Sequence, residues 1–140
     1  MRTRFFAVVA LLAAFAPGAA VADETLAGTL EKLSKDQIAA FNREDAAGTL
    51  AFSYTKSPAF DAAKADLPTL FAESDPRAEQ VGFQYIGHDE EFAVAPVKVK
   101  VSADAPDFQD NVVDTLMIFH TENGSWKIFD TYLLSGQLVP

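Results

Sequence analysis

Two side chains near the C-terminus, Asp130 and Tyr132, are of types that could carry out acid–base chemistry. If Asn123-Gly124 forms a two-residue hairpin turn, the flanking strands place both residues on one sheet face, with Thr115 opposite Tyr132. A carboxylate beside a phenol could act as a general base next to a hydrogen-bond donor. The other interpretation is that Asp130 lies in solvent or hydrogen-bonds to a helix terminus.

The two histidines do not have the spacing of metal ligands. His88 precedes the acidic run Asp89-Glu90-Glu91, which could hold a divalent cation loosely, and His120 lies next to the predicted turn. Metal sites usually need three or four converging ligands, so we expect solvated histidines and no metal site. Cysteine is absent, which excludes thiol chemistry. We expect no cofactor, because the chain lacks a glycine-rich phosphate loop, a nucleophile elbow and an HExxH motif.

The predicted hairpin of residues 114–134 has two substantially apolar faces, unlike a sheet with one wetted side. One face carries Val113, Thr115, Met117, Phe119, Trp126, Ile128, Asp130 and Tyr132, and the other carries Asp114, Leu116, Ile118, His120, Lys127, Phe129, Thr131 and Leu133. Helices can cover only one face. The second must therefore meet other strands, a partner subunit or the edge of a pocket. We expect Leu116, Ile118, Phe129 and Leu133 to form a homodimer interface.

Three helices are predicted before the sheet. Leu26, Leu30, Leu33, Gln37 and Phe41 recur every three to four residues, which indicates an amphipathic helix over about residues 25–42. Asp45 suits the N-cap of a short second helix that ends near residue 52. Proline is tolerated in a first helical turn, so Asp66-Leu67-Pro68 predicts a third helix that ends near residue 72. Ser57-Pro58 is interpreted as a break between helices.

The pattern then alternates, as strands do. Val81, Phe83 and Tyr85 share one face of a first strand, and a second strand covers residues 92–101 with a bulge or bend at Pro96, where the alternation slips. Together with the hairpin this gives about four strands. Helices followed by strands indicate one α+β domain with a curved antiparallel sheet.

The N-terminal 22 residues are predicted to be a signal peptide. Arg2 and Arg4 form a positive region, an apolar run follows, and small residues precede a cleavage site near Ala22. We therefore expect a periplasmic or secreted protein whose domain spans residues 23–140 and does not enter the membrane. The net charge of −9 makes nucleic acid and anionic lipid poor partners.

The closing segment Asn123-Gly124-Ser125-Trp126-Lys127-Ile128 resembles the C-terminal hairpin of nuclear-transport-factor-2-like (SnoaL-like) domains. The run Ala39-Ala40-Phe41-Asn42-Arg43-Glu44-Asp45 between two helices is similar to theirs as well. Residues 37–60 resemble an uncharacterised bacterial domain-of-unknown-function family within that group.

This resemblance implies a cone-shaped, cystatin-like fold in which a curved sheet wraps around helices and encloses a cavity. Its members include enzymes, ligand carriers and protein-binding adaptors, so the fold does not select a function. Catalytic members use Asp, His or Tyr inside the cone. We expect a pocket that includes Tyr54, Tyr85, Thr115, Trp126, Asp130 and Tyr132. We also expect a non-enzymatic module that binds a small apolar or amphipathic ligand or a protein, the alternative being an isomerase- or dehydratase-like enzyme that uses Asp130 and Tyr132.

Overall fold

The computed structural model describes residues 18–139, and their side chains from residue 24 onward. The first 17 residues of the predicted signal peptide lie outside this range. Three helices come first, α1 (Gly18–Asn42), α2 (Ala46–Leu50) and α3 (Pro58–Ser74). No helix within the described range is long and apolar enough to span a membrane.

The predicted stripe of α1 is confirmed. Leu30 is fully buried, and Leu26 and Leu33 pack against the core beside it. Asp45 caps α2 as predicted, because its Oδ1 accepts a hydrogen bond from the Gly48 N–H at 2.8 Å.

The predicted start of α3 is wrong. The helix begins at Pro58, and Ser57 is its N-cap, accepting from the Phe60 N–H at 3.1 Å. A proline at the first helical position loses no hydrogen bond, since its N–H would have no partner inside the helix. Ser57-Pro58 therefore starts a helix where it was interpreted as a break, and Pro68 lies inside that helix.

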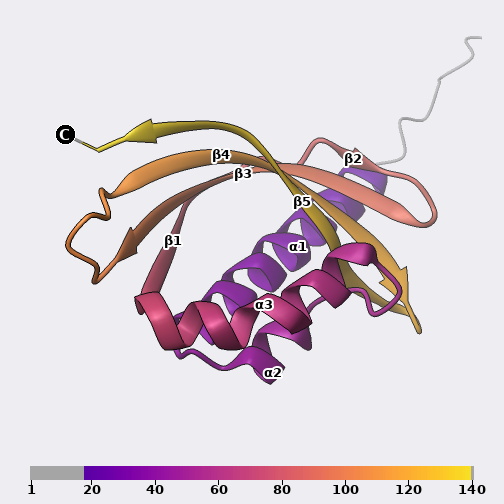
Figure 1. The fold of residues 1–140 in the computed structure, drawn as a ribbon. Coiled ribbons are helices and arrows are strands. Elements are labelled where there is room, and N and C mark those ends of the chain that lie inside the picture. Colours follow the sequence, from indigo (N-terminus) through magenta and orange to yellow (C-terminus); the bar gives the residue numbers. More distant parts are fainter. Residues whose placement is uncertain (1–17, 140) are drawn as a thin grey trace, which may run out of the picture.

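Five antiparallel strands follow the helices: β1 (Pro76–Phe83), β2 (Gly87–His88), β3 (Phe92–Ala103), β4 (Asn111–Glu122) and β5 (Ser125–Leu138). The sheet order is β1-β3-β4-β5, and β2 pairs with β3 beyond the end of β1. The sheet curves over the helices, which cover its concave face (Figure 1). The α+β architecture with a curved antiparallel sheet is thus confirmed.

The predicted bulge at Pro96 is wrong. β3 pairs with β4 without interruption, and Ala93, Ala95 and Val97 are all buried on the concave face. The Pro96 carbonyl accepts from the Gln84 N–H at 3.0 Å. The N–H and C=O of a strand residue point to the same side. An N–H at residue 96 would therefore also point towards residue 84, just beyond the end of β1, and away from β4. No ladder bond to β4 is lost.

The Asn123-Gly124 turn is confirmed, with φ of 51° and 78°, and so are the pairs Glu122–Ser125 and Phe119–Ile128. Two bulges then shift β5 against β4, one at residues 128–130 and one at residues 133–135. As a result Asp130 pairs with Ile118 and Tyr132 with Leu116, where Met117 and Thr115 were predicted. Paired residues share a face, so Asp130 and Tyr132 lie on the convex face.

The core lies between the concave face and α1. It consists of Leu30, Ala93, Ala95, Val97, Met117, Phe119 and Ile128, with Phe52, Phe83, Tyr85, Val99 and Trp126 packed against it. Leu30 of α1 and the two alanines of β3 belong to the same cluster of buried side chains. The large core side chains fill the part of the concave face that α1 covers.

Candidate functional site

The predicted catalytic pair is formed, but at the surface. The Tyr132 hydroxyl hydrogen-bonds to the Asp130 carboxylate, and this bond together with the negative charge raises the pKa of Tyr132. Asp130 Oδ1 also accepts from the Thr131 N–H at 2.7 Å. Tyr132 is 49% exposed. The pair therefore meets water, and the apolar surroundings that the acid–base interpretation requires are missing.

The other predicted pocket residues do not converge with this pair. The Thr115 Oγ1 donates to the Val97 carbonyl at 2.8 Å and is buried in the sheet. Trp126 packs against the core next to α1, and the Tyr85 hydroxyl hydrogen-bonds to Nδ1 of His88. Tyr54 lies at the opposite side of the sheet from these residues, against His120.

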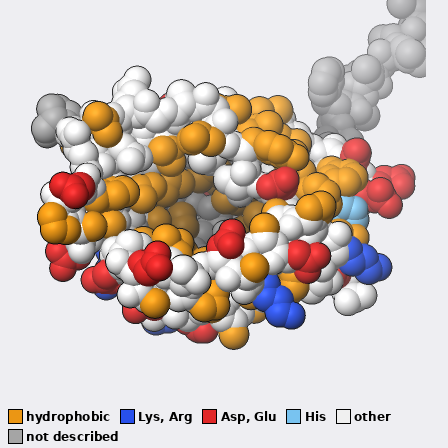
Figure 2. Space-filling view, viewed as in Figure 1, with side chains coloured by type: hydrophobic (Ala, Val, Ile, Leu, Met, Phe, Trp, Pro, Cys, Tyr) orange, Lys and Arg blue, Asp and Glu red, His pale blue; other side chains and the backbone are white. Residues whose placement is uncertain are grey.

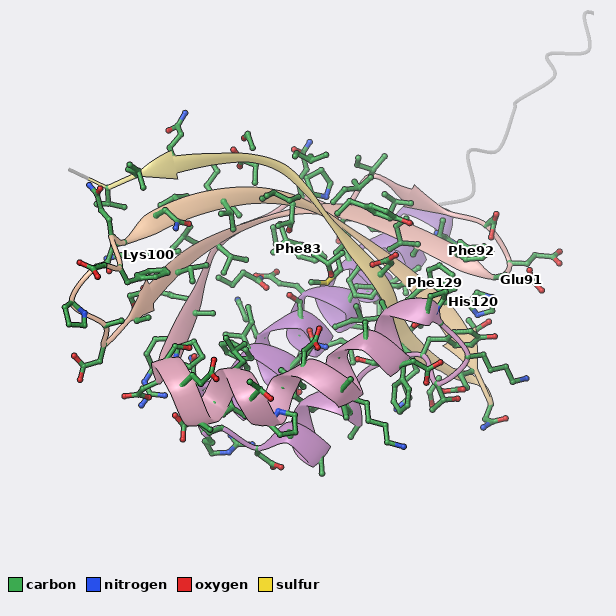
Figure 3. All side chains as sticks on the ribbon, viewed as in Figure 1. Phe83, Glu91, Phe92, Lys100, His120 and Phe129 are labelled. Atoms are coloured by element: carbon green, nitrogen blue, oxygen red, sulfur yellow. The ribbon has the colours of Figure 1, made fainter. Side chains whose placement is uncertain are left out.

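An aromatic cluster occupies the hairpin end of the convex face (Figure 3). The ring centroids of Tyr54 and His120 are 4.3 Å apart, those of Phe92 and His120 are 4.5 Å apart, and Phe129 lies 5.7 Å from both Tyr54 and Phe92. Tyr54 reaches the cluster because residues 52–54 run along the edge of β5, with the Tyr54 N–H donating to the Ile128 carbonyl at 2.7 Å.

The four residues predicted to form a homodimer interface do not lie together on one face. Phe129 packs inside the cluster, while Leu116 and Ile118 lie half-buried further along the convex face. Leu133 pairs with Thr115 and so belongs to the concave face. The bulge at residues 128–130 is the physical reason, because one extra residue reverses the faces of those that follow it.

The histidines serve local contacts. Nδ1 of His120 lies 2.6 Å from the Thr121 carbonyl. Asp89 accepts from the Phe92 and Glu91 N–H groups at 2.7 and 2.8 Å. These bonds, with a smaller contribution from the positive charges of His88 and His120, lower the pKa of Asp89. Within residues 18–139 no three His, Asp or Glu side chains gather closely enough to hold a metal ion.

Two adjoining pockets lie among the helices and the edges of the sheet. Gln37, Ser53 and Ala63 line both of them. The first pocket, of about 210 Å³, is otherwise lined by Ile38, Phe41, Thr49, Leu50, Leu67 and Ala78. The second, of about 220 Å³, is completed by Ser57, Ala59, Phe60 and the β5 residues 128–131. Figure 2 shows that the molecule is hollowed between the sheet and α3, with hydrophobic side chains around the opening.

The two pockets differ in chemistry. Apolar side chains predominate in the first, with Phe41 packed edge-on against Phe71 at 5.3 Å. The second has polar groups, and Gln37 Nε2 donates to Ser53 Oγ at 3.3 Å where the two pockets meet. Asp130 lines the second pocket as well. The two adjoining pockets can therefore hold a ligand with an apolar body and a polar end.

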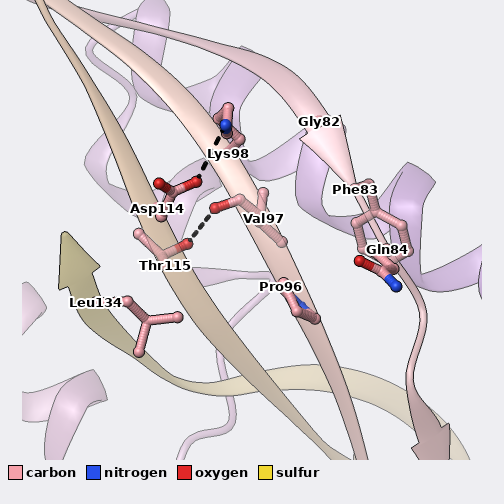
Figure 4. A pocket seen from close by; sticks show the side chains of 9 residues that line it. All are labelled: Gly82, Phe83, Gln84, Pro96, Val97, Lys98, Asp114, Thr115 and Leu134. Atoms are coloured by element: carbon pink, nitrogen blue, oxygen red, sulfur yellow. Dashed lines mark hydrogen bonds and ion pairs between the residues drawn. The ribbon is translucent and has the colours of Figure 1, made fainter. Parts of the chain in front are cut away.

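Another pocket, of about 480 Å³, lies around Gly82, Pro96 and Leu134 (Figure 4). Gly82 lines it, and a Cβ at this position would come within 3.2 Å of the Lys98 Cβ. Its charged groups are already paired, since Lys98 Nζ lies 3.4 Å from Asp114 Oδ1 and Ser135 Oγ donates to Asp114 Oδ2 at 3.0 Å. This pocket offers few unused polar groups to a ligand.

Sequence reasoning missed the paired pockets. Their shared residues are small or polar and come from α1, α3 and the chain between α2 and α3. The spacing of residues within one element carries no signal for such a site. The corrected start of α3 at Ser57-Pro58 was the one available indication, because that start brings residues 59–63 into the helix.

Solved structures share this fold. A protein of unknown function from Mycobacterium tuberculosis is 14% identical, with a TM-score of 0.68 over 86% of this chain and 76% of that one. An uncharacterised protein with a cystatin-like fold from Caulobacter vibrioides is 14% identical, with a TM-score of 0.61 over 81% and 89%. A hexachlorocyclohexane dehydrochlorinase is 7% identical, with a TM-score of 0.57 over 86% and 93%. At these identities the likeness establishes the fold alone.

The cystatin-like, nuclear-transport-factor-2-like fold implied by the sequence resemblance is thus confirmed. No curated protein matches the chain. The family whose model matches differs from the domain-of-unknown-function family expected above. It is described as the C-terminal domain of anti-sigma-I factor RsgI9, and it matches residues 32–137. The chain therefore belongs to the family of RsgI9 C-terminal domains.

Proposed function

We propose that this domain is a non-enzymatic binding module that holds a small amphipathic ligand in the paired pockets. The observation that carries the proposal is the junction of an apolar and a polar pocket at Gln37, Ser53 and Ala63. An apolar lining with a few polar groups that fix orientation is the usual make-up of a ligand site. A ligand would place its apolar body near Phe41 and Leu67 and its polar end near Ser57.

The volumes limit the ligand. Each pocket measures little more than 200 Å³, below the range of about 300–1,000 Å³ that is usual for a ligand pocket. Together they reach the lower end of that range. The ligand is therefore one ring or a short chain with one polar end. The negative charge of Asp130, which lines the second pocket, favours a neutral or cationic polar end over an anionic one.

One observation favours the alternative, an enzyme of the isomerase or dehydratase type. Asp130 accepts a hydrogen bond from Tyr132 and also lines the second pocket. A base would have to reach a ligand in that pocket while Tyr132 remains about half exposed. If Asp130 is such a base, Asp130→Asn abolishes turnover, whereas a binding module keeps its ligand in that variant.

We also propose that the protein is exported, with cleavage near Ala22. α1 begins at Gly18, so cleavage there would remove the first residues of that helix and leave its buried stripe from Leu26 onward intact. The acidic composition supports a partner other than nucleic acid or anionic lipid. Mass spectrometry of the purified protein gives the N-terminus directly.

The test of the binding module is native mass spectrometry of the purified protein, followed by extraction of any small molecule that is released. Ala63→Phe fills the junction of the two pockets, and Ala62→Phe is the matched control because Ala62 is exposed on the same helix. We expect a ligand in the wild type and in Ala62→Phe, and a loss of at least about tenfold in occupancy in Ala63→Phe. A ligand retained equally by all three proteins would refute the assignment of the site.

A further inference from the structure

Within residues 18–139, no strand pairs with the outer edge of β5 along most of its length. β5 is the last strand of the sheet, and β4 pairs with one side of it. On the other side residues 52–54 reach only as far as Ile128. From residue 131 to residue 138 every side chain is exposed. In Figure 1 this yellow end of β5 runs along the rim of the sheet with no other described element beyond it.

This edge lacks the usual protection against pairing with another strand. Its sequence, Thr-Tyr-Leu-Leu-Ser-Gly-Gln-Leu, contains no charge and no proline, although the whole chain carries 20 acidic residues. Leu133, Leu134 and Leu138 are 69%, 59% and 64% exposed. Edge strands are normally blunted by charges, prolines or bulges. Of these devices residues 131–138 have only the bulge at residues 133–135.

The opposite edge of the sheet, formed by β1, is closed. The Asn42 side chain pairs with the backbone of Ala78 as a neighbouring strand would, donating to its carbonyl and accepting from its N–H, both at 2.8 Å. A bulge at Val81 and the charged residues Arg77 and Glu79 protect the rest of β1. Among the long strands, the structure therefore leaves one open edge per molecule.

Backbone groups of β5 are available for pairing along the free edge. The Val139 N–H donates to the Asp110 carbonyl at 2.8 Å, on the side of β4. Since successive residues of a strand direct their N–H and C=O groups to opposite sides, the groups of Leu138 and Gly136 point outward. The free edge thus presents both donors and acceptors.

We propose that this edge binds a second copy of the chain, with two β5 strands pairing antiparallel about a two-fold axis to make one continuous sheet. Charge favours a second copy, because two acidic molecules can approach where neither carries a charge. An antiparallel pair about a two-fold axis uses the same residues on both sides. Each copy has one open edge, so assembly stops at the dimer. This interface differs from the convex sheet face and goes beyond the proposed ligand site.

The test is light scattering after size exclusion, from about 1 to about 100 μM protein, because a dimer dissociates on dilution. Leu138→Pro removes an outward N–H but no bond to β4, and Leu133→Lys places a charge on the edge. Leu70→Lys is the matched control, since Leu70 is an exposed leucine of α3. We expect dimers in the wild type and the control, and a dissociation constant at least about tenfold higher in both edge variants.

A wild type that stays monomeric up to the highest concentration would overturn the proposal, and so would a dimer that survives both edge substitutions. Circular dichroism checks that the variants are folded. If they are not, single cysteines decide the question, because the chain has none of its own. Among single cysteines placed in turn at positions 131–138, the one nearest the two-fold axis should give cross-linked dimers on mild oxidation, because only there does a residue face its own copy with the two Cα atoms within disulfide reach. Cross-linking by Ile118→Cys alone would move the interface to the sheet face.

Discussion

Asn42 at the end of α1 is the residue whose removal tests the account of the β1 edge most directly. Its amide makes two hydrogen bonds of 2.8 Å to the Ala78 backbone, and its own carbonyl accepts from Arg77 Nη1 at 2.7 Å. The substitution Asn42→Ala removes the first two bonds and leaves the third. It also leaves a half-buried N–H and C=O at Ala78 without these partners.

The magnitude follows from the number of bonds lost. A hydrogen bond contributes about 0.5–1.5 kcal/mol net, so the loss of two predicts about 2 kcal/mol less free energy of unfolding. For a domain of this size 1 kcal/mol corresponds to about 4 °C in Tm, which gives a decrease of about 8 °C. Arg77→Ala is the control, because it removes only the exposed contacts to Asn42 and Asp75 and is expected to cost less than about 0.5 kcal/mol.

Urea denaturation followed by circular dichroism, with thermal melts of the same proteins, measures both quantities. Hydrogen exchange at Ala78 adds a local measurement, because its N–H should lose protection in Asn42→Ala before the central strands do. If Asn42→Ala unfolds at the same urea concentration as the wild type, with Arg77→Ala also unchanged, the two amide bonds do not stabilise the edge and the reasoning fails.

Two further predictions concern other local contacts. Ser57→Ala removes the N-cap of α3 and should lower the free energy of unfolding, measured by urea denaturation, by about 1 kcal/mol. Pro58→Ala keeps the cap and should lower it by less. The reverse order would contradict the assignment of Ser57 as the cap. Asp89 has a lowered pKa in the folded protein, so its contribution to stability is present above the ordinary Asp pKa and is lost as the pH falls through the folded value. NMR titration should find that pKa below 3.8, the ordinary value, and the acid side of the stability profile should flatten in Asp89→Asn; an unshifted titration would count against the two backbone bonds.

Much of the fold could be predicted, because its signals are local. The apolar stripe of α1, the Asp45 cap and the Asn123-Gly124 turn each depend on residues close together in the sequence, and the structure confirms all three. The register of β5 could not be predicted beyond Ile128. A bulge adds one residue to a strand without a distinct sequence pattern. The prediction from alternation therefore placed Asp130 and Tyr132 on the face of Met117 and Thr115, whereas both lie on the opposite, convex face.

The interior of the sheet shows a second limit. Ala93 and Ala95 are fully buried, but small side chains contribute little to a search for large apolar residues, so the sequence of β3 does not mark these two positions as core. The paired pockets show a third limit, since Gln37, Ser53 and Ala63 come together only through the packing of separate segments. Local structure could be predicted from the sequence, whereas contacts between segments far apart in the sequence could not.

The two bulges of β5 also determine where the chain can change in length during evolution. Each bulge sets three residues of β5 against two of β4. Deleting one residue at either bulge would restore a regular ladder and leave the pairing of every other β5 residue unchanged. A deletion anywhere else in the strand would reverse the faces of the residues that follow it. Single-residue gaps among relatives should therefore gather at Phe129 and Leu134.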